Sequence, residues 1–178
     1  KRHLVPFGEY VPLEDQLRGL ITFFDLPMSH NQPGPERQTP MTAGDLVLSL
    51  SICYEVVFGD LVRNTVVDPD VLITISNDTW FGNSIGPWQH LQMVRMRAIE
   101  NAKYMVRATN NGVTAVIDEK GRVLSVLPQF EPGVLRSDIV VLKGVTPYVR
   151  WGSVPILGTA WLVVLCLGWV SRHYRGEH

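Results

Sequence analysis

Short runs of apolar and β-branched residues predict strands in the first half of the chain. Residues 46–52 (LVLSLSI) and 71–76 (VLITIS) are such runs, and each ends in polar or reactive residues. Residues 58–67 between them predict a helix. A strand, a helix and a second strand with short connections predict a parallel pair with a right-handed crossover. Because sites in such sheets gather at the carboxyl ends of strands, Cys53 and Asn77-Asp78 are expected at one edge.

The second half of the chain predicts one long helix and four more strands. The helix covers about residues 88–102, with Pro87 near its first turn and four apolar residues spaced to face a core: Leu91, Val94, Ala98 and Ala102. The strands are expected at 104–109, 113–117, 123–126 and 134–141. The tight-turn signal Asn110-Asn111-Gly112 joins the first two of them.

A continuous apolar stretch near the C-terminus predicts a membrane-spanning helix. Residues 151–170 (WGSVPILGTAWLVVLCLGWV) contain no charged residue, and a helix of ~20 such residues crosses a hydrocarbon core. Arg150 and Arg172 flank the stretch, and Trp151 and Trp169 suit an interfacial aromatic belt. A buried helix of a soluble protein is the alternative, which the length and flanks disfavour. The flanking positive charges nearly balance and hardly decide the orientation.

Two segments near the N-terminus allow more than one interpretation. Residues 13–24 predict a short helix with a wide apolar face, which either packs on the core or inserts at a lipid surface. Residues 28–45 are rich in Pro, Gly, Asn, Gln and Thr and predict a long loop. A lid over a binding cleft is one role for a loop of this length.

Composition narrows the function classes. The chain has 178 residues and a formal net charge of −1, with no striped basic surface or phosphate-binding motif, so nucleic-acid binding is the weakest class. Its two cysteines, Cys53 and Cys166, lie in segments of different character and are expected to be free thiols. The five histidines are dispersed, and no spacing of metal ligands emerges, so we predict no metal and no cofactor.

Cys53 is the first candidate for chemistry. It follows the strand at 46–52 and precedes Glu55 by two residues, so both side chains would share one face if the strand continued, with Tyr54 on the other face. A thiol at a strand end can act as a nucleophile once its proton is removed. Taken alone, a buried structural cysteine is the more common interpretation.

Several motifs together strengthen the catalytic interpretation. They are KRHLVPFGEYVP at residues 1–12, CYE at 53–55, NDTWFG at 77–82 and RAIENAKYMVRATNNG at 97–112. This combination resembles the nitrilase, or carbon-nitrogen hydrolase, superfamily. With the C-terminal apolar span it is similar, over nearly the whole chain, to the membrane-bound apolipoprotein N-acyltransferase family of bacteria.

The resemblance implies an α/β fold, a nitrilase-like α-β-β-α sandwich. Residues 1–146 would form the C-terminal part of the catalytic domain, lacking upstream strands. Residues 147–178 would form a transmembrane helix at about 151–170 and a short cytoplasmic tail. The implied location is the bacterial inner membrane, in a multi-pass protein with its catalytic domain on the periplasmic side.

The resemblance also implies catalytic roles. Cys53 matches the family's nucleophile and Lys1 its lysine, whereas the family's general-base glutamate lies upstream of the lysine and has no counterpart in this sequence. Glu9 and Glu55 match supporting glutamates, with a solvated turn carboxylate and a surface ion pair as the alternatives.

Three aromatic residues near the strand ends are candidates for substrate contact: Tyr54, Trp80 and Phe81. Exposed aromatic side chains there would suit an acyl chain, but Trp80 and Phe81 are equally compatible with a core. His90 has no motif or triad partner and is expected to be structural or solvent-facing. Asn110 and Asn111 fit a turn better than a substrate contact.

The implied function is acyl transfer. A fatty acyl chain would pass from a membrane phospholipid to Cys53 as a thioester, and then to the N-terminal amine of the diacylglyceryl-cysteine of an apolipoprotein. A membrane-anchored amidase or nitrilase acting on a small soluble amide or nitrile is the nearest alternative. A non-catalytic membrane-anchored scaffold is disfavoured by the joint presence of Lys1, Glu9 and Cys53.

Overall fold

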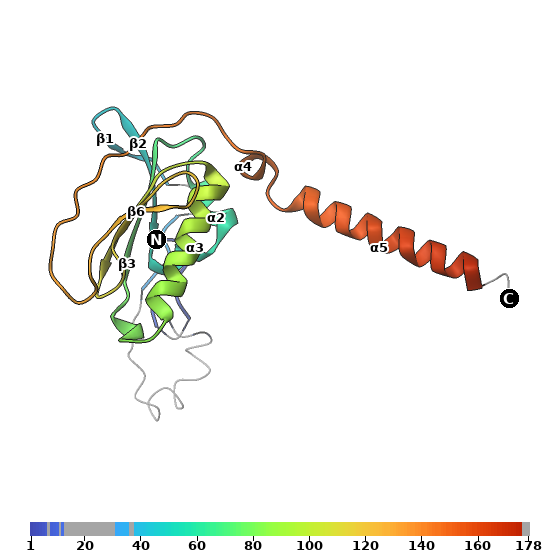
Figure 1. The fold of residues 1–178 in the computed structure, drawn as a ribbon, viewed down its shortest axis with the longest axis horizontal. Helices are drawn as coiled ribbons and strands as arrows, with labels where there is room; N and C mark the ends of the chain where they lie inside the picture. The colour runs from blue at the N-terminus through green and yellow to red at the C-terminus, as the bar shows by residue number, and fades with distance from the viewer. Residues whose placement is uncertain (7, 11, 13–30, 36–37, 176–178) are drawn as a thin grey trace, which may run out of the picture.

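The computed structural model describes residues 1–6, 8–10, 12, 31–35 and 38–175, and it contains a six-stranded mixed sheet (Figure 1). The strands are β1 (Met41–Ala43), β2 (Leu46–Ile52), β3 (Val71–Asn77), β4 (Met105–Asn110), β5 (Ala115–Ile117) and β6 (Val123–Val126). The helices are η1 (Cys53–Val57), α2 (Gly59–Thr65), η2 (Thr79–Phe81), α3 (Gly86–Asn101), α4 (Pro147–Trp151) and α5 (Val154–Arg175).

The parallel centre of the sheet confirms the predicted strand-helix-strand arrangement. Strand β3 pairs in parallel with both β2 and β4, with Ile52 opposite Ile75 and Ile75 opposite Ala108. Strands β2, β3 and β4 follow one another in the same direction across the sheet. With right-handed crossovers, this order puts α2 and α3 on the same face of the sheet, as Figure 1 shows. The carboxyl ends of the three strands therefore lie side by side at one edge.

The hydrophobic core lies between α3, η1 and the sheet. Leu91, Val94 and Ala98 of α3 are buried there, as their spacing predicts. Their partners come from the strands, from η1 and α2, and from the turn before β5: Val56, Val62, Leu72, Met105, Val113, Ala115 and Ile117. Ala102 instead ends the helix in the left-handed conformation, with φ of 50°.

The opposite face of the sheet is apolar and, among the described residues, only partly covered. Ile75 on β3 is 46% exposed although it lies in the middle of the sheet. The segment after β6 runs along the outside of the sheet to α4 (Figure 1). A sheet with helices on one face and an apolar second face is one half of the expected sandwich.

Two predictions about strands are wrong. Residues 134–141 have a strand-like sequence but form no strand, because no described strand lies beside them to complete a hydrogen-bonded ladder. Residues 41–43, assigned to a loop, form β1, because the edge of β2 takes a short antiparallel partner through the turn at Gly44-Asp45. The predicted helix at 13–24 lies outside the described residues.

Ion pairs and hydrogen bonds attach the segment that leaves the domain, residues 142–152, which we call the exit segment. Asp70 accepts from Lys143 Nζ at 2.5 Å and from Val47 N at 2.8 Å. Asp68 accepts from Lys103 Nζ at 2.6 Å and from Gly144 N at 2.9 Å. These contacts join the exit segment to the amino-terminal ends of β2 and β3, opposite the edge that carries Cys53.

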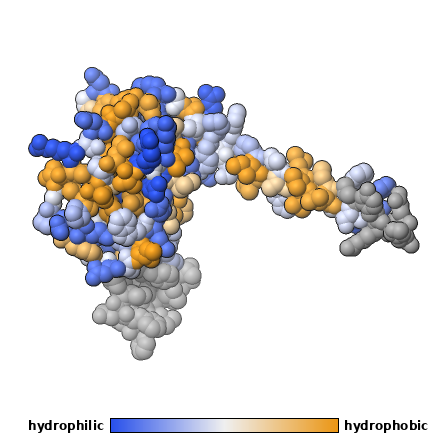
Figure 2. Space-filling model, viewed as in Figure 1, coloured by the Kyte–Doolittle hydropathy of each residue, from blue (hydrophilic) through white to orange (hydrophobic). Residues whose placement is uncertain are grey.

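Helix α5 projects away from the domain (Figure 1), and apolar residues run along it (Figure 2). It begins at Val154 rather than at 151, because Gly152 ends α4 with φ of 61°. Residues Val154–His173 are long and apolar enough to cross a membrane, and none of that surface is buried in the domain. Apolar exposure of this extent is typical of a surface that contacts lipid or another protein.

Candidate active site

Cys53 lies where β2 gives way to the short helix η1. Its φ is 55°, in the left-handed region that residues other than glycine rarely adopt. Holding a side chain there costs on the order of 1 kcal/mol or more, and such residues cluster at functional sites. The strand ends at Ile52, so the predicted sharing of one strand face by Cys53 and Glu55 does not apply. The thiol is free and half-buried.

Glu55 organises the backbone around Cys53. One carboxylate oxygen accepts from Ile52 N at 2.8 Å, at the start of η1. The other accepts from Arg2 N at 2.6 Å and from His3 N at 3.1 Å. Glu55 is only 5% exposed, so the alternative of a surface ion pair is wrong. The carboxylate connects the N-terminal segment to the turn that carries Cys53.

Lys1 is paired with Glu9. The ammonium lies 2.5 Å from each oxygen of the Glu9 carboxylate, and Glu9 also accepts from Val5 N at 2.8 Å. The Lys1 side chain is 11% exposed and that of Glu9 is 27% exposed. Glu9 is therefore a fixed partner of the ammonium and not a solvated turn carboxylate.

Aromatic contacts reinforce the connection between the N-terminal segment and η1. The His3 ring lies over Phe58 at a centroid distance of 4.1 Å, and the Tyr54 ring meets Phe58 edge-on at 5.0 Å. Tyr54 is thus half-buried against Phe58. Together with Glu55, these rings hold Arg2 and His3, which follow Lys1, against the nucleophile turn, Ile52–Glu55, although the two segments are far apart in sequence.

Trp80 and Phe81 lie at the adjacent strand end. They belong to η2, directly after β3, in a turn of residues 77–81 that we call the strand-end turn. Trp80 is 75% exposed and Phe81 is 43% exposed, so the core interpretation is wrong. The Phe81 ring packs against Gly86 at the start of α3, where a Cβ atom would have no room.

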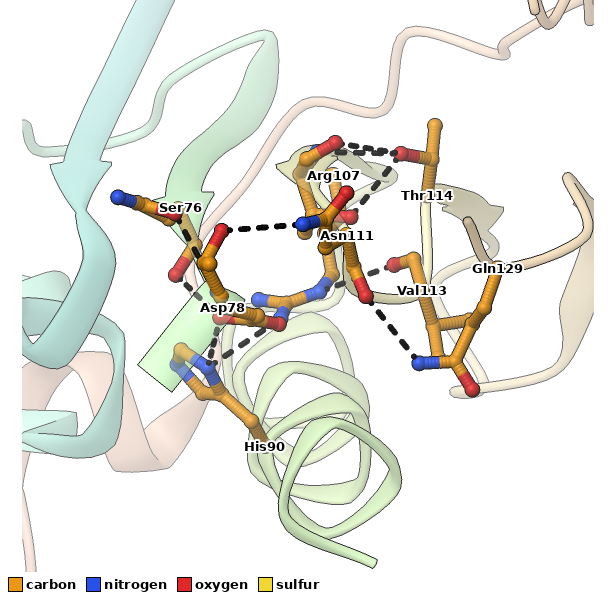
Figure 3. Close-up of polar contacts among 11 residues, drawn as sticks. Ser76, Asp78, His90, Arg107, Asn111, Val113, Thr114 and Gln129 are labelled. Atoms are coloured by element: carbon orange, nitrogen blue, oxygen red, sulfur yellow. Dashed lines mark hydrogen bonds and ion pairs between the residues drawn. The ribbon is translucent and has the colours of Figure 1, made fainter. Parts of the chain in front are cut away.

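A buried charged cluster lies beneath the strand-end turn (Figure 3). Asp78 is fully buried, and its carboxylate pairs with Arg107 Nη2 at 2.5 Å and accepts from Ser76 Oγ at 2.6 Å. His90 Nδ1 lies 3.2 Å from both Asp78 Oδ1 and Arg107 Nη2. Arg107 Nε donates to Val113 O at 3.1 Å. His90 is therefore structural, as one of the two expectations had it.

The pKa values of Asp78 and Arg107 are both shifted in this cluster. Burial raises the pKa of Asp78, but hydrogen bonds from His90 and Ser76 and the Arg107 charge outweigh it, and the net shift is downward. Burial lowers the pKa of Arg107, against the opposing effects of Asp78 and Cys53.

Two cavities lie outside the nucleophile turn. One of about 620 Å³ lies between the turn joining β4 and β5 and residues 127–135, with Arg107 in its wall. The other, of about 280 Å³, is lined by Arg2, His3, Leu4, Tyr10, Asn31 and Pro33. Within the described ranges, no group of three or more His, Cys, Asp or Glu residues is arranged to hold a metal ion.

Sequence comparison supports the family that the motifs suggest. The profile of the carbon-nitrogen hydrolase family matches residues 1–144. The chain belongs to the carbon-nitrogen hydrolase family. That match includes Lys1, Glu9, Cys53 and Glu55, and it ends in the exit segment, before α4 and α5.

Named relatives point to one branch of this family. The chain is 51% identical over 177 residues to the apolipoprotein N-acyltransferase of Azotobacter vinelandii, covering 99% of this chain and 34% of the relative. It is 53% identical over 169 residues to that of Pseudomonas syringae pv. tomato, covering 95% of this chain and 33% of the relative. The chain thus spans about a third of the length of the curated relatives it matches.

Solved structures confirm the nitrilase-like fold. The crystal structure of an amidase from Nesterenkonia sp. matches with a TM-score of 0.52 at 21% sequence identity, covering 77% of this chain and 51% of the amidase. At this identity the likeness shows the shared fold and no more.

Sequence reasoning missed the cluster of Asp78, His90 and Arg107. The motifs NDTWFG and RATNNG contain two of its members, but a strand pattern does not reveal that an arginine on β4 points inward to an aspartate after β3. One available signal was charge within otherwise apolar strand sequence, because a charged residue there requires a buried partner.

Proposed function

We propose that this chain carries the nucleophile of an apolipoprotein N-acyltransferase. The main support is the cluster at the nucleophile turn, where Cys53 is held in the left-handed conformation and Glu55 binds the backbone of residues that follow Lys1. Identity of 51% over 99% of the chain to a relative with that name agrees with it.

In the first step, Cys53 attacks the ester carbonyl of a phospholipid. The thiol proton is lost to a base, which in the family is a glutamate upstream of the lysine. A sulfur–carbon bond forms, and the carbon–oxygen bond to glycerol breaks. The lysophospholipid leaves with a proton on its oxygen, and the acyl chain stays on Cys53 as a thioester.

Lys1 would stabilise the charge that develops on the carbonyl oxygen. Its ammonium can donate to this oxygen while Glu9 holds it in place through both carboxylate oxygens. A donor at such a position is worth ~10²-fold to 10³-fold in rate. Cys53 is the nucleophile, Lys1 the oxyanion donor, and Glu9 and Glu55 position these two residues.

In the second step, the amine of the lipidated N-terminal cysteine of an apolipoprotein attacks the thioester. A carbon–nitrogen bond forms, the carbon–sulfur bond breaks, and the amine proton returns through the base to the sulfur. Trp80, Phe81 and Tyr54 are the proposed contacts for the acyl chain, because the first two are exposed at the neighbouring strand end. No metal or cofactor takes part in these steps.

Both proposed substrates are lipids, so the site should act at a membrane. The apolar helix α5 suits an anchor, and we propose the bacterial inner membrane, in a multi-pass protein with the catalytic domain on the periplasmic side and the residues after α5 in the cytoplasm. Residues 1–146 would be the catalytic part and 147–178 the membrane part.

The nucleophile can be tested by intact mass spectrometry of the full protein in phospholipid vesicles. Wild-type protein should gain the mass of one acyl chain, and hydroxylamine should remove it. C53A should gain none, whereas C166A, which removes the other free cysteine, should behave as wild type. An acyl group that persists on C53A contradicts the proposal, as does a wild-type protein that reacts only with small amides.

The role of Lys1 can be tested in the same vesicles. K1M should slow acylation of Cys53 by ~10²-fold or more, because the oxyanion donor is lost, while vesicle binding stays unchanged. The matched control is K120M, because the Lys120 side chain is 68% exposed and lies outside the site. Equal acylation rates for K1M and wild type would exclude the oxyanion role.

A further inference from the structure

We propose that Arg107 is a positioning residue for the acyl donor: its buried ion pair with Asp78 fixes the strand-end turn, which carries Trp80 and Phe81 at the strand end next to that of Cys53. This inference rests on the proposed function, because it assigns the turn to the acyl chain. It concerns residues outside the nucleophile turn and the Lys1–Glu9 pair.

The buried ion pair between Arg107 and Asp78 carries an energetic cost. Arg107 and Asp78 are 1% and 0% exposed, and burying two charges carries a desolvation penalty that their attraction often does not offset. Apolar residues of similar volume would usually serve stability as well. A purely stabilising role therefore explains the buried pair poorly. A requirement for a fixed geometry of the strand-end turn explains it better.

The ion pair holds Asp78, which connects two elements of the fold. Asp78 N donates to Asn110 O at 3.1 Å and Phe81 N donates to Asp78 O at 3.0 Å, so Asp78 connects β4 to η2. Gly112 leaves room for the carboxylate, because a Cβ atom there would lie 2.7 Å from the Asp78 Cβ. Ser76, His90 and Arg107 then fix the carboxylate from three sides (Figure 3).

The strand-end turn lies at the same edge of the sheet as Cys53. Ile52 and Ile75 are paired across the parallel strands, so the residues that follow them, Cys53 and Ser76, emerge at the same edge. Strand β3 and η1 are in direct contact. A chain attached to a carbonyl at Cys53 would meet the exposed Trp80 and Phe81 side chains, and a shift of the turn would misplace a long chain while leaving the sulfur unchanged.

The experiment compares two acyl donors on the full protein in vesicles. One donor is a diacyl phospholipid, and the other is p-nitrophenyl acetate, whose two-carbon acyl group has no long chain to be positioned. Acylation of Cys53 is followed by mass spectrometry for wild type, R107M, R107K, D78N/R107M and the control R95M. Arg95 is a suitable control because it bonds to Gly121 O and Gln92, which are outside the cluster.

A positioning role predicts a loss that depends on the donor. R107M should react with phospholipid on the order of 10-fold to 100-fold more slowly and with p-nitrophenyl acetate within about twofold of wild type. R107K should recover part of the phospholipid rate, because it retains the charge near Asp78. R95M should match wild type with both donors.

The double variant D78N/R107M separates positioning from folding, because it leaves no unpaired buried charge. Its melting temperature should return toward wild type while its phospholipid rate stays low. Recovery of that rate along with stability would overturn the inference, as would equal losses with both donors. Wild-type protein that reacts with p-nitrophenyl acetate but not with phospholipid would instead contradict the proposed function, and this inference with it.

Discussion

Single residues with unusual backbone or burial define the candidate site. Cys53 has a positive φ, Glu55 is a buried carboxylate that accepts three backbone amides, and Asp78 is a fully buried carboxylate. Each of these costs free energy in isolation and is compensated by specific partners. Their occurrence at adjacent strand ends is the structural basis for the active site that we propose at this edge of the sheet.

The packing of Asp78 against Gly112 predicts that a side chain at position 112 destabilises the fold. In G112A the new methyl group would collide with the Asp78 side chain, so we expect a loss of about 1–3 kcal/mol in the free energy of unfolding. Urea denaturation of the purified protein measures it. The matched variant G133A meets only Leu127, at 3.5 Å, and should change stability by less than about 0.5 kcal/mol. Equal stability of the two variants would contradict the packing argument.

Secondary-structure elements are joined by ion pairs at the edge away from Cys53. Asp70, before β3, contacts the start of β2 through Val47 N and the exit segment through Lys143. The hydrogen bonds from Lys143 and Val47 lower the pKa of Asp70, and the hydrogen bond to Asp70 raises the pKa of Lys143. The attachment of the exit segment should therefore depend on pH.

The pKa shifts of Asp70 and Lys143 determine how this attachment changes with pH. The contribution of Asp70, whose pKa is lowered, is present above its ordinary pKa of 3.8 and is lost as the pH falls through the folded-state value. The contribution of Lys143, whose pKa is raised, is present below 10.5 and is lost as the pH rises through the folded-state value. The difference in melting temperature between wild type and K143M should be largest between these limits and shrink toward both.

Thermal melts across the pH range measure this difference. K120M is the control, since Lys120 and Glu119 are 3.9 Å apart and the lysine is exposed. A difference between wild type and K143M that stays constant from acid to alkaline pH would show that the Asp70–Lys143 pair does not link the exit segment to stability.

At the scale of the whole molecule, a nitrilase-like half-sandwich is connected to an exposed apolar helix. Helix α5 buries none of its candidate spanning surface in the domain, so water is an unfavourable environment for it. The exit segment that precedes it is attached to the domain by Asp68 and Asp70. The domain and the proposed anchor are thus joined through a short segment with defined contacts.

Membrane insertion of α5 is open to a direct test. L162R places a charge near the middle of the helix and should reduce insertion by about 3 kcal/mol, whereas S171R, near the end, should have a much smaller effect. Glycosylation mapping of a reporter that carries residues 147–175 measures the inserted fraction. Equal insertion of L162R and the unaltered segment would contradict a membrane-spanning role.

The strands and helices that the sequence predicted well are those with a strong local pattern. Strand β2 ends at Ile52 and β6 covers Val123–Val126, as expected, because β-branched runs bounded by turn residues specify their own limits. Residues 134–141 have a similar pattern and form no strand, because a strand also needs a neighbour. For the same reason β1 was missed, since three residues carry little signal without their partner.

The sequence by itself determined the parallel βαβ centre, the apolar C-terminal helix and the motifs that mark Cys53, Lys1, Glu9 and Glu55 for the carbon-nitrogen hydrolase family. Only the tertiary structure decided that Glu55 binds the backbone of residues 2 and 3 and that Asp78, His90 and Arg107 form one buried cluster. Local patterns arise from the chain's own period and turn chemistry, whereas these contacts join residues far apart in sequence. Such contacts exist only once the strands have paired and their carboxyl ends share an edge.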